Sequence, residues 1–137
     1  KHTILRLGNI FGPSPGMRFH TVVSKFCWQA VTGQQLSVWK TALDQRRPYL
    51  DLVDVCRAIC FAIKGNVYGA YNLVTRTATV RDVIAAIEKN IPVRLDIIDR
   101  EGDGSSQDMT SNLVGFKYTG DLQRGIDATL DLFRQRA

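Results

Sequence analysis

A fifteen-residue stretch near the middle of the chain, QRRPYLDLVDVCRAI at residues 45–59, carries a strand signal followed at once by a helix signal. Pro48 suits the start of a strand, because its nitrogen cannot donate to a β-ladder, and residues 49–52 then favour an extended segment. Asp54 is typical of a helix N-cap. Apolar side chains recur behind it at helical spacing, at Val55, Ile59 and Ile63. The stretch therefore predicts a strand that leads directly into a helix, as in α/β folds.

Strand and helix signals alternate along the whole chain. Apolar or alternating runs predict strands at residues 3–7, 35–39, 69–74 and 93–98. The helical spacing of apolar residues predicts helices at residues 19–31, 55–64, 80–89 and 122–134. Thr79 and Asp121 are typical N-caps for the last two helices. At 137 residues the chain suits one domain, so we expect a single small mixed α/β domain that spans residues 1–137.

The composition excludes several classes of partner. The net charge is +5, but the basic residues are scattered, and the sequence shows no recognition helix, zinc pattern or aromatic platform. We therefore expect no nucleic-acid partner. No apolar run is long enough to span a membrane, and we expect no membrane association. A modest basic excess suits a phosphorylated small molecule.

The three cysteines are Cys27, Cys56 and Cys60. An odd number without a secretory signal indicates a reducing compartment, so we expect a cytoplasmic protein. Cys56 and Cys60 lie four residues apart on one face of the expected helix, but no histidine or further cysteine completes a metal set. We therefore expect both to be small buried apolar residues, and we expect no metal site.

Two adjacent arginines, Arg46 and Arg47, stand at the mouth of the expected strand. Their planar guanidiniums match the geometry of phosphate, so the pair is suited to grip a doubly charged oxyanion. The alternative is that both are solvated surface charges, which contribute little to binding or stability.

Several motifs occur in the order found in one enzyme family. RRPYLDLVDVCRAI resembles the R-D-F-x-x-V-x-D-V-x-R-A segment of NAD-dependent nucleotide-sugar epimerases and dehydratases, in the extended short-chain dehydrogenase/reductase family. LRLGNIFGP is similar to the family's L-R-x-x-N-x-Y/F-G-P, GAYNLV to G-x-x-Y-N-V, and REGD to R-P-G-D. The resemblance covers nearly the whole chain, but only the back part of such an enzyme.

The resemblance implies a fold and a reaction. The chain is expected to be the C-terminal substrate-binding domain of an extended short-chain dehydrogenase/reductase that lacks the N-terminal Rossmann lobe. Residues 1–12 are then a strand and loop of the missing Rossmann sheet. In the parent enzyme, NAD or NADP takes a hydride from a nucleotide-diphosphate sugar, a keto-sugar forms, and epimerisation or dehydration follows.

The resemblance also assigns residues to the substrate. Arg47 and Arg100 are expected to hold the diphosphate, because two arginines supply charge-assisted hydrogen bonds. Asp103 is expected to accept hydrogen bonds from the ribose hydroxyls. Asn9 is expected to orient the substrate, and Trp39 to stack against the base. Alternatively Asn9 is an ordinary turn residue, Trp39 a core or rim side chain, and REGD a polar surface turn.

The sequence contains few residues that are expected to contact a cofactor. By resemblance, Leu7 and Ile10 lie near the nicotinamide, but no G-x-x-G-x-x-G occurs to hold a pyrophosphate. The family's catalytic Tyr-x-x-x-Lys pair is also absent, so we assign no catalytic residue. We expect NAD or NADP to be bound mainly by the missing lobe, no cofactor in this chain, and no activity from the chain alone.

Other interpretations remain open at this point. The chain could be a non-catalytic module that binds a nucleoside diphosphate or a protein. It could also be the substrate lobe of a reductase with a non-sugar substrate, since KTALDQ replaces the family's G-D-G-x-Q turn. The chain begins directly in a strand-like run, so we expect a piece of a longer protein. Thr3–Leu7, a strand without its sheet, should pair with another copy as a homodimer, pair elsewhere in the chain, or be disordered.

Overall fold

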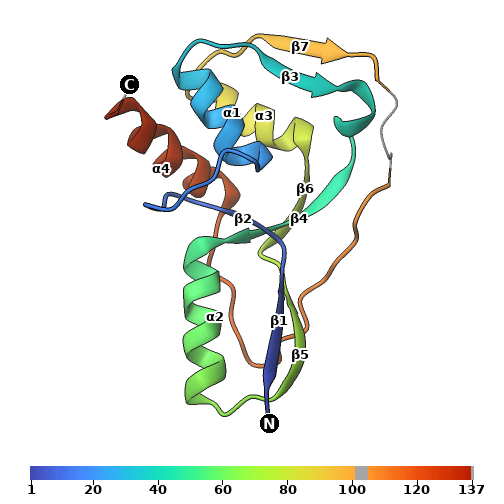
Figure 1. Ribbon diagram of the computed structural model, residues 1–137, viewed down its shortest axis with the longest axis vertical. Helices are drawn as coiled ribbons and strands as arrows, with labels where there is room; N and C mark the ends of the chain where they lie inside the picture. Colours follow the sequence, from blue (N-terminus) through green and yellow to red (C-terminus); the bar gives the residue numbers. More distant parts are fainter. Residues whose placement is uncertain (101–104, 137) are drawn as a thin grey trace.

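The computed structural model describes residues 1–100 and 105–136 (Figure 1). The strands are β1 (Thr3–Leu7), β2 (Asn9–Phe11), β3 (Leu36–Trp39), β4 (Arg46–Asp51), β5 (Gly69–Leu73), β6 (Arg76–Thr79) and β7 (Leu95–Ile98). The helices are α1 (Val22–Val31), α2 (Leu52–Lys64), α3 (Val80–Glu88) and α4 (Leu122–Arg134), with a 3-10 turn at Lys40–Ala42. This alternation confirms the mixed α/β class. Within the two described ranges, every helix falls short of what a membrane crossing requires.

Three small sheets are distributed along the long axis of the molecule (Figure 1). β1 and β5 pair in parallel at one end, and β3 and β7 pair in parallel at the other. Between them, β4 pairs in parallel with β2 and antiparallel with β6. The sequence did not predict β2 or β6. β2 has only three residues, and the RTAT of β6 contains no alternation of apolar side chains.

β1 pairs with β5 of the same chain. The register runs from Thr3 opposite Gly69 to Leu7 opposite Leu73. This confirms one of the three outcomes expected for the segment. β1 has β5 as its single strand neighbour among the described residues, so its other edge carries unpaired backbone groups.

The larger core cluster lies between α1, α3, α4 and the middle sheet. The stripe expected on the last helix is confirmed, because Ile126 and Leu130 are fully buried and Phe133 is 5% exposed. Asp121 caps this helix by accepting a hydrogen bond from the Arg124 amide at 2.8 Å. Other members of the cluster are Phe11, Val23, Phe26, Leu36, Val83 and Ile87.

The N-terminus of α3 is also capped as expected. The Thr79 hydroxyl accepts a hydrogen bond from the Asp82 amide, and the Asp82 carboxylate accepts one from the Thr79 amide at 2.8 Å. Together these bonds form a capping box. The Thr79 hydrogen bonds lower the pKa of Asp82 below its usual value.

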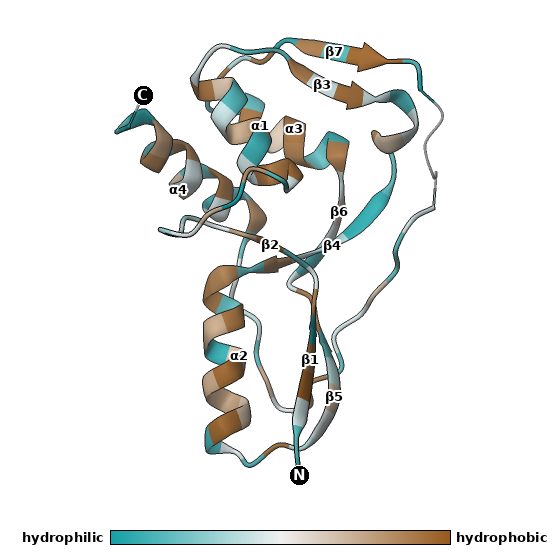
Figure 2. Ribbon diagram, in the orientation of Figure 1, coloured by the Kyte–Doolittle hydropathy of each residue, from teal (hydrophilic) through white to brown (hydrophobic). Residues whose placement is uncertain are grey.

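The smaller core cluster joins α2 to β1, β5 and residues 113–118. Its buried members are Leu50, Val55, Ala58, Leu73 and Leu113. The predicted stripe of α2 was therefore only partly right. Val55 is buried, but Ile59 is 43% and Ile63 71% exposed, and Figure 2 shows the colours of apolar residues along most of the α2 ribbon.

The prediction that both cysteines of α2 are buried was wrong. Cys56 and Cys60 are both exposed, because Ala58 and Ala62 occupy the buried face of α2 instead. In β7, Leu95 and Ile97 are 40% and 52% exposed, because this strand pairs with β3 at the rim of the molecule rather than over the core.

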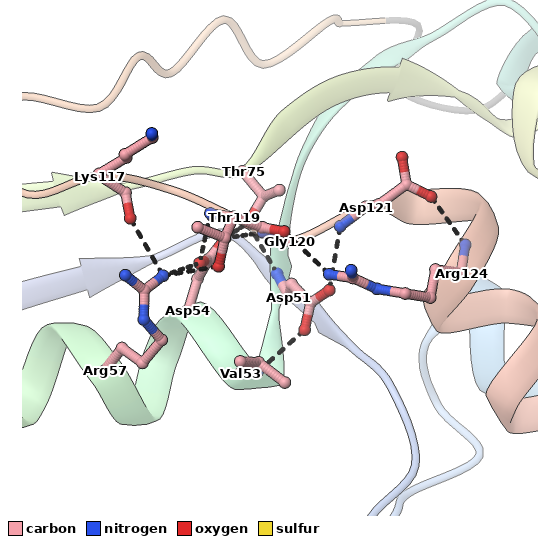
Figure 3. Close-up of polar contacts among 10 residues, drawn as sticks. All are labelled: Asp51, Val53, Asp54, Arg57, Thr75, Lys117, Thr119, Gly120, Asp121 and Arg124. Carbon is pink, nitrogen blue, oxygen red and sulfur yellow. Dashed lines mark hydrogen bonds and ion pairs between the residues drawn. The ribbon is translucent and has the colours of Figure 1, made fainter.

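The predicted cap of α2 was also wrong. Asp51 is the N-cap, accepting a hydrogen bond from the Val53 amide at 2.9 Å, so the helix begins before Asp54. Asp54 instead lies fully buried in the first turn, where it accepts hydrogen bonds from the Thr119 and Gly120 amides, both at 2.9 Å (Figure 3). Asp54 therefore ties the segment before α4 to the start of α2.

Candidate functional site

A cavity of about 430 Å³ opens beside the middle sheet, where the first turn of α1 and the segment after β3 approach β4. It is lined by Asn9, His20, Thr21, Val22, Trp39, Ala42, Gln45, Arg47, Tyr49 and Val80. Three of the residues that the sequence assigns to a substrate, Asn9, Arg47 and Trp39, therefore meet in one cavity. They come from three different strands.

Arg47 supplies the positive charge of this cavity. It lies half-buried on β4, two residues before Tyr49, and successive odd residues of a strand point to the same face. Its guanidinium donates a hydrogen bond to the Gln45 side chain at 2.8 Å, which orients the fork. A half-buried, oriented guanidinium is suited to bind a phosphate group in a bidentate manner.

Arg46 does not share this role. It lies on the opposite face of β4, largely exposed, and its guanidinium is 3.8 Å from the Asp108 carboxylate. The expectation that both arginines grip one oxyanion was therefore wrong, because the alternation of the strand sends them to opposite sides. Arg46 fits the alternative of a solvated surface charge.

Arg100 contacts Trp39, which lines the cavity. The Trp39 ring is 42% exposed at the end of β3, and the Arg100 guanidinium lies 5.0 Å from the centre of the ring. This cation–π contact places a second arginine beside the cavity, although Arg100 does not line it. Trp39 is thus an exposed side chain at the rim of the cavity.

Asp103, the residue expected to bind ribose, lies outside the described residues. It follows Arg100 by three positions in the sequence. Its assignment stays a prediction.

Tyr49 and His20 are among the lining residues that the sequence did not assign. Tyr49 shares the face of Arg47, and the two-residue spacing was a signal that could have identified it. Burial raises the pKa of Tyr49 to about 12, and the charge of Arg47 offsets part of that rise. The hydroxyl therefore stays protonated at neutral pH. His20 precedes α1, whereas the sequence predicted a helix that begins at residue 19. No local pattern singled out His20.

Leu7 and Ile10 lie apart from the Arg47 cavity. Leu7 lines a separate hollow with Gly8, Pro48 and Asn9, and Ile10 packs on the smaller core cluster. Asn9 lines both hollows, so it lies between the Arg47 cavity and the hollow that Leu7 lines.

The chain does not fit a whole nicotinamide cofactor. Leu7 is 42% exposed and offers an apolar contact, but the 137 residues hold no glycine-rich turn that leads from a strand into a helix N-terminus for the pyrophosphate. Across residues 1–100 and 105–136, no group of three or more potential ligands could hold a metal ion.

Comparison with solved structures defines the class of fold. UDP-glucose 4-epimerase of Thermus thermophilus, complexed with NAD, matches 98% of this chain with a TM-score of 0.82 and 23% identity. The match covers 47% of that chain. RMD of Pseudomonas aeruginosa, complexed with NADPH, gives a TM-score of 0.83 and 19% identity over 98% of this chain and 49% of its own. The fold is thus about half of an extended short-chain dehydrogenase/reductase epimerase fold.

A third structure carries a nucleotide sugar. UDP-glucuronic acid 4-epimerase of Bacillus cereus, in complex with UDP-glucuronic acid and NAD, gives a TM-score of 0.75 and 22% identity over 98% of this chain and 46% of its own. The chain spans about half the length of the solved structures it matches. A search of the curated proteins found no match.

The family follows from a match to the sequence itself. The model of the NAD dependent epimerase/dehydratase family matches residues 1–74, which is more than half of the chain. The chain belongs to this family.

Proposed function

We propose that this chain is the C-terminal, substrate-binding part of an NAD- or NADP-dependent enzyme that epimerises or dehydrates a nucleotide-diphosphate sugar. The observation that carries the proposal is the cavity in which Arg47, Asn9 and Trp39 converge, with Arg100 against the tryptophan. Membership of the epimerase/dehydratase family supports it, as does the UDP-sugar bound by one structural relative.

In this proposal the residues of the chain bind and orient the substrate. Arg47 and Arg100 hold the diphosphate, Trp39 stacks on the base, Asn9 orients the sugar, and Asp103 binds the ribose. Tyr49, protonated at neutral pH, can donate a hydrogen bond to a substrate oxygen. The redox chemistry belongs to NAD or NADP, whose main site lies outside this chain.

The proposal also explains the exposed apolar surface around β1. Residues 1–12 would complete a Rossmann sheet whose remaining strands lie in the rest of the protein. The free edge of β1 would accept the next strand, and exposed side chains such as Ile4 and Ile59 would be covered. These two residues are 47% and 43% exposed.

The test is a titration of the chain with UDP, GDP, CDP and dTDP, followed by calorimetry. We expect saturable binding of one diphosphate. Arg47→Ala and Arg100→Ala should each weaken it roughly ten- to one-hundred-fold, because each removes a charge-assisted contact of about 1.5–3 kcal/mol. Arg134→Ala is a matched control, since Arg134 forms an exposed ion pair with Asp131 on α4 and should leave affinity unchanged.

Equal affinities of the Arg47→Ala variant and the unchanged chain would overturn the assignment of the cavity. A non-catalytic diphosphate-binding module is the second candidate, because the sequence keeps the binding residues without a Tyr-x-x-x-Lys pair. The coding sequence upstream distinguishes the two: a glycine-rich strand-turn-helix and a Tyr-x-x-x-Lys there support the enzyme, and their absence supports the module.

A further inference from the structure

The face of α2 that turns toward residues 115–117 carries two exposed thiols. Cys56 and Cys60 are both free, and they line one cavity of about 480 Å³. Its apolar wall is formed by Phe61 and Phe116, whose ring centres are 5.6 Å apart. Neither thiol lines the cavity of Arg47, so the proposed substrate site does not use them.

Helix geometry keeps the two thiols from joining each other. Residues four apart in an α-helix have Cβ atoms about 5–6 Å apart. A disulfide needs its Cβ atoms about 3.5–4.5 Å apart, so a Cys56–Cys60 bridge would require α2 to distort. A disulfide formed by either thiol therefore takes its second sulfur from another molecule.

The surroundings of the thiols are positively charged. Arg57, Lys64 and Lys117 all line the same cavity. Arg57 is neutralised by the buried Asp54, 3.1 Å away, and its guanidinium lies over the Phe116 ring at 5.2 Å. The two lysines have no ion-pair partner within the described part of the chain, so they carry the net charge of the cavity.

We propose that the Cys56–Cys60 cavity is a site of reversible thiol modification by small anionic disulfides, with glutathione disulfide as the type of reagent. The apolar wall accommodates the body of the reagent, and the two lysines attract its carboxylates. A cysteine thiolate attacks one sulfur of the reagent. A protein–reagent S–S bond forms, the reagent's own S–S bond breaks, and the other half leaves as a thiolate.

The modification persists because the neighbouring thiol cannot displace it. Displacement would close the Cys56–Cys60 bridge that the helix geometry disfavours. A small external thiol reverses the reaction instead. The site therefore behaves as a thiol switch that responds to the external disulfide rather than as a dithiol that closes on itself.

The experiment compares two small disulfides on the 137-residue chain at low ionic strength. The probes are 5,5′-dithiobis(2-nitrobenzoate), a dianion, and cystamine, a dication, with the modified residues located by peptide mass spectrometry. Each rate is divided by the rate of the same probe with N-acetylcysteinamide, because the aromatic disulfide is intrinsically far more reactive than cystamine. After this division we expect Cys56 and Cys60 to react at least tenfold faster with the dianion, and we expect added salt to reduce this ratio. Cys27→Ala should not change the rates, because Cys27 is fully buried.

Two variants of equal net charge separate a local effect from the charge of the whole chain. Lys64→Gln with Lys117→Gln should abolish most of the preference for the dianion. Lys25→Gln with Lys89→Gln, which removes two exposed lysines outside the cavity, should keep it. The same preference in both double variants would overturn the proposal. So would formation of a Cys56–Cys60 disulfide, seen as a loss of two hydrogens from the mass of the chain.

Discussion

Asp54 is a buried carboxylate whose hydrogen bonds all come from within the chain. One oxygen accepts from the Thr119 amide at 2.9 Å, and the other accepts from the Thr75 hydroxyl at 2.8 Å and the Gly120 amide at 2.9 Å (Figure 3). Arg57 adds an ion pair at 3.1 Å. A carboxylate without exposed surface needs such partners, because water cannot reach it.

Removing this carboxylate should be costly. Asp54→Ala leaves buried hydrogen-bond donors without an acceptor and the Arg57 charge without a partner. We therefore expect the free energy of unfolding to fall by about 3–5 kcal/mol in urea titrations. Asp54→Asn keeps the shape and one acceptor, so its loss should be smaller. Asp131→Ala, at an exposed ion pair, is the control and should change little. An Asp54→Ala variant as stable as Asp131→Ala would contradict this account.

Cys27 makes stability depend on alkaline pH. Burial, with a smaller contribution from the charge of Asp127, raises the pKa of Cys27 to about 12 from 9.0. Between these values the unfolded chain loses the proton while the folded chain retains it, so stability falls as pH rises from about 9 toward 12. We expect Cys27→Ala to show a shallower fall over this window in denaturation series. An identical slope in the two proteins would show that Cys27 does not cause the fall in stability.

Asn9, Arg47 and Trp39 stand in family-like motifs, and all three line one cavity. Their contacts with a substrate stay a prediction. Asp54 was misread as a cap because an acidic residue before an apolar run looks the same in sequence whether it caps a helix or lies buried. Only the amides of residues 119 and 120, far along the chain, decide between these roles.

At the scale of elements, α4 approaches β2 through a glycine. A Cβ placed on Gly125 would lie 2.5 Å from a carbon of the Phe11 ring, which is only 1% exposed. The helix can therefore pack this close only while position 125 lacks a side chain. Phe11 and Gly125 together determine the distance between α4 and the middle sheet.

Gly125→Ala should destabilise the chain even though alanine favours helices. We expect overpacking of about 1–3 kcal/mol to outweigh the gain of up to about 1 kcal/mol in helix propensity, as measured by thermal or urea unfolding. Gly16→Ala, where a Cβ meets no atom within 4 Å, is the matched control. In a Phe11→Leu background the cost should shrink. Equal costs in both backgrounds would show that the ring is not responsible.

The helices and most of the strands could be predicted from the sequence. Which face of each element is buried was harder to predict. Periodicity identified α1, α3 and α4, with capping residues at Thr79 and Asp121 as expected. In α2 the apolar residues surround much of the helix, so periodicity could not tell that Ala58 faces the core while Ile63 faces outward. The short strands β2 and β6 depend on pairing with β4, which is a tertiary property.

At the scale of the whole molecule, the chain combines the Arg47 cavity with a sequence that has no glycine-rich phosphate turn and no Tyr-x-x-x-Lys pair. We therefore predict no turnover when the pure chain is incubated with NAD and UDP-glucose, with formation of reduced cofactor and of epimerised sugar as the two readouts. Any sustained turnover by the purified chain would contradict the prediction, because the sequence has neither a phosphate-binding glycine turn nor a Tyr-x-x-x-Lys pair.

The pairing of β1 with β5 has a consequence for synthesis on the ribosome. Thr3 lies opposite Gly69, so β1 is made long before its partner exists. At about 5–20 residues per second, translation leaves β1 without β5 for several seconds. The pairing of these two strands is therefore timed by the emergence of β5 rather than by the sequence of β1 itself.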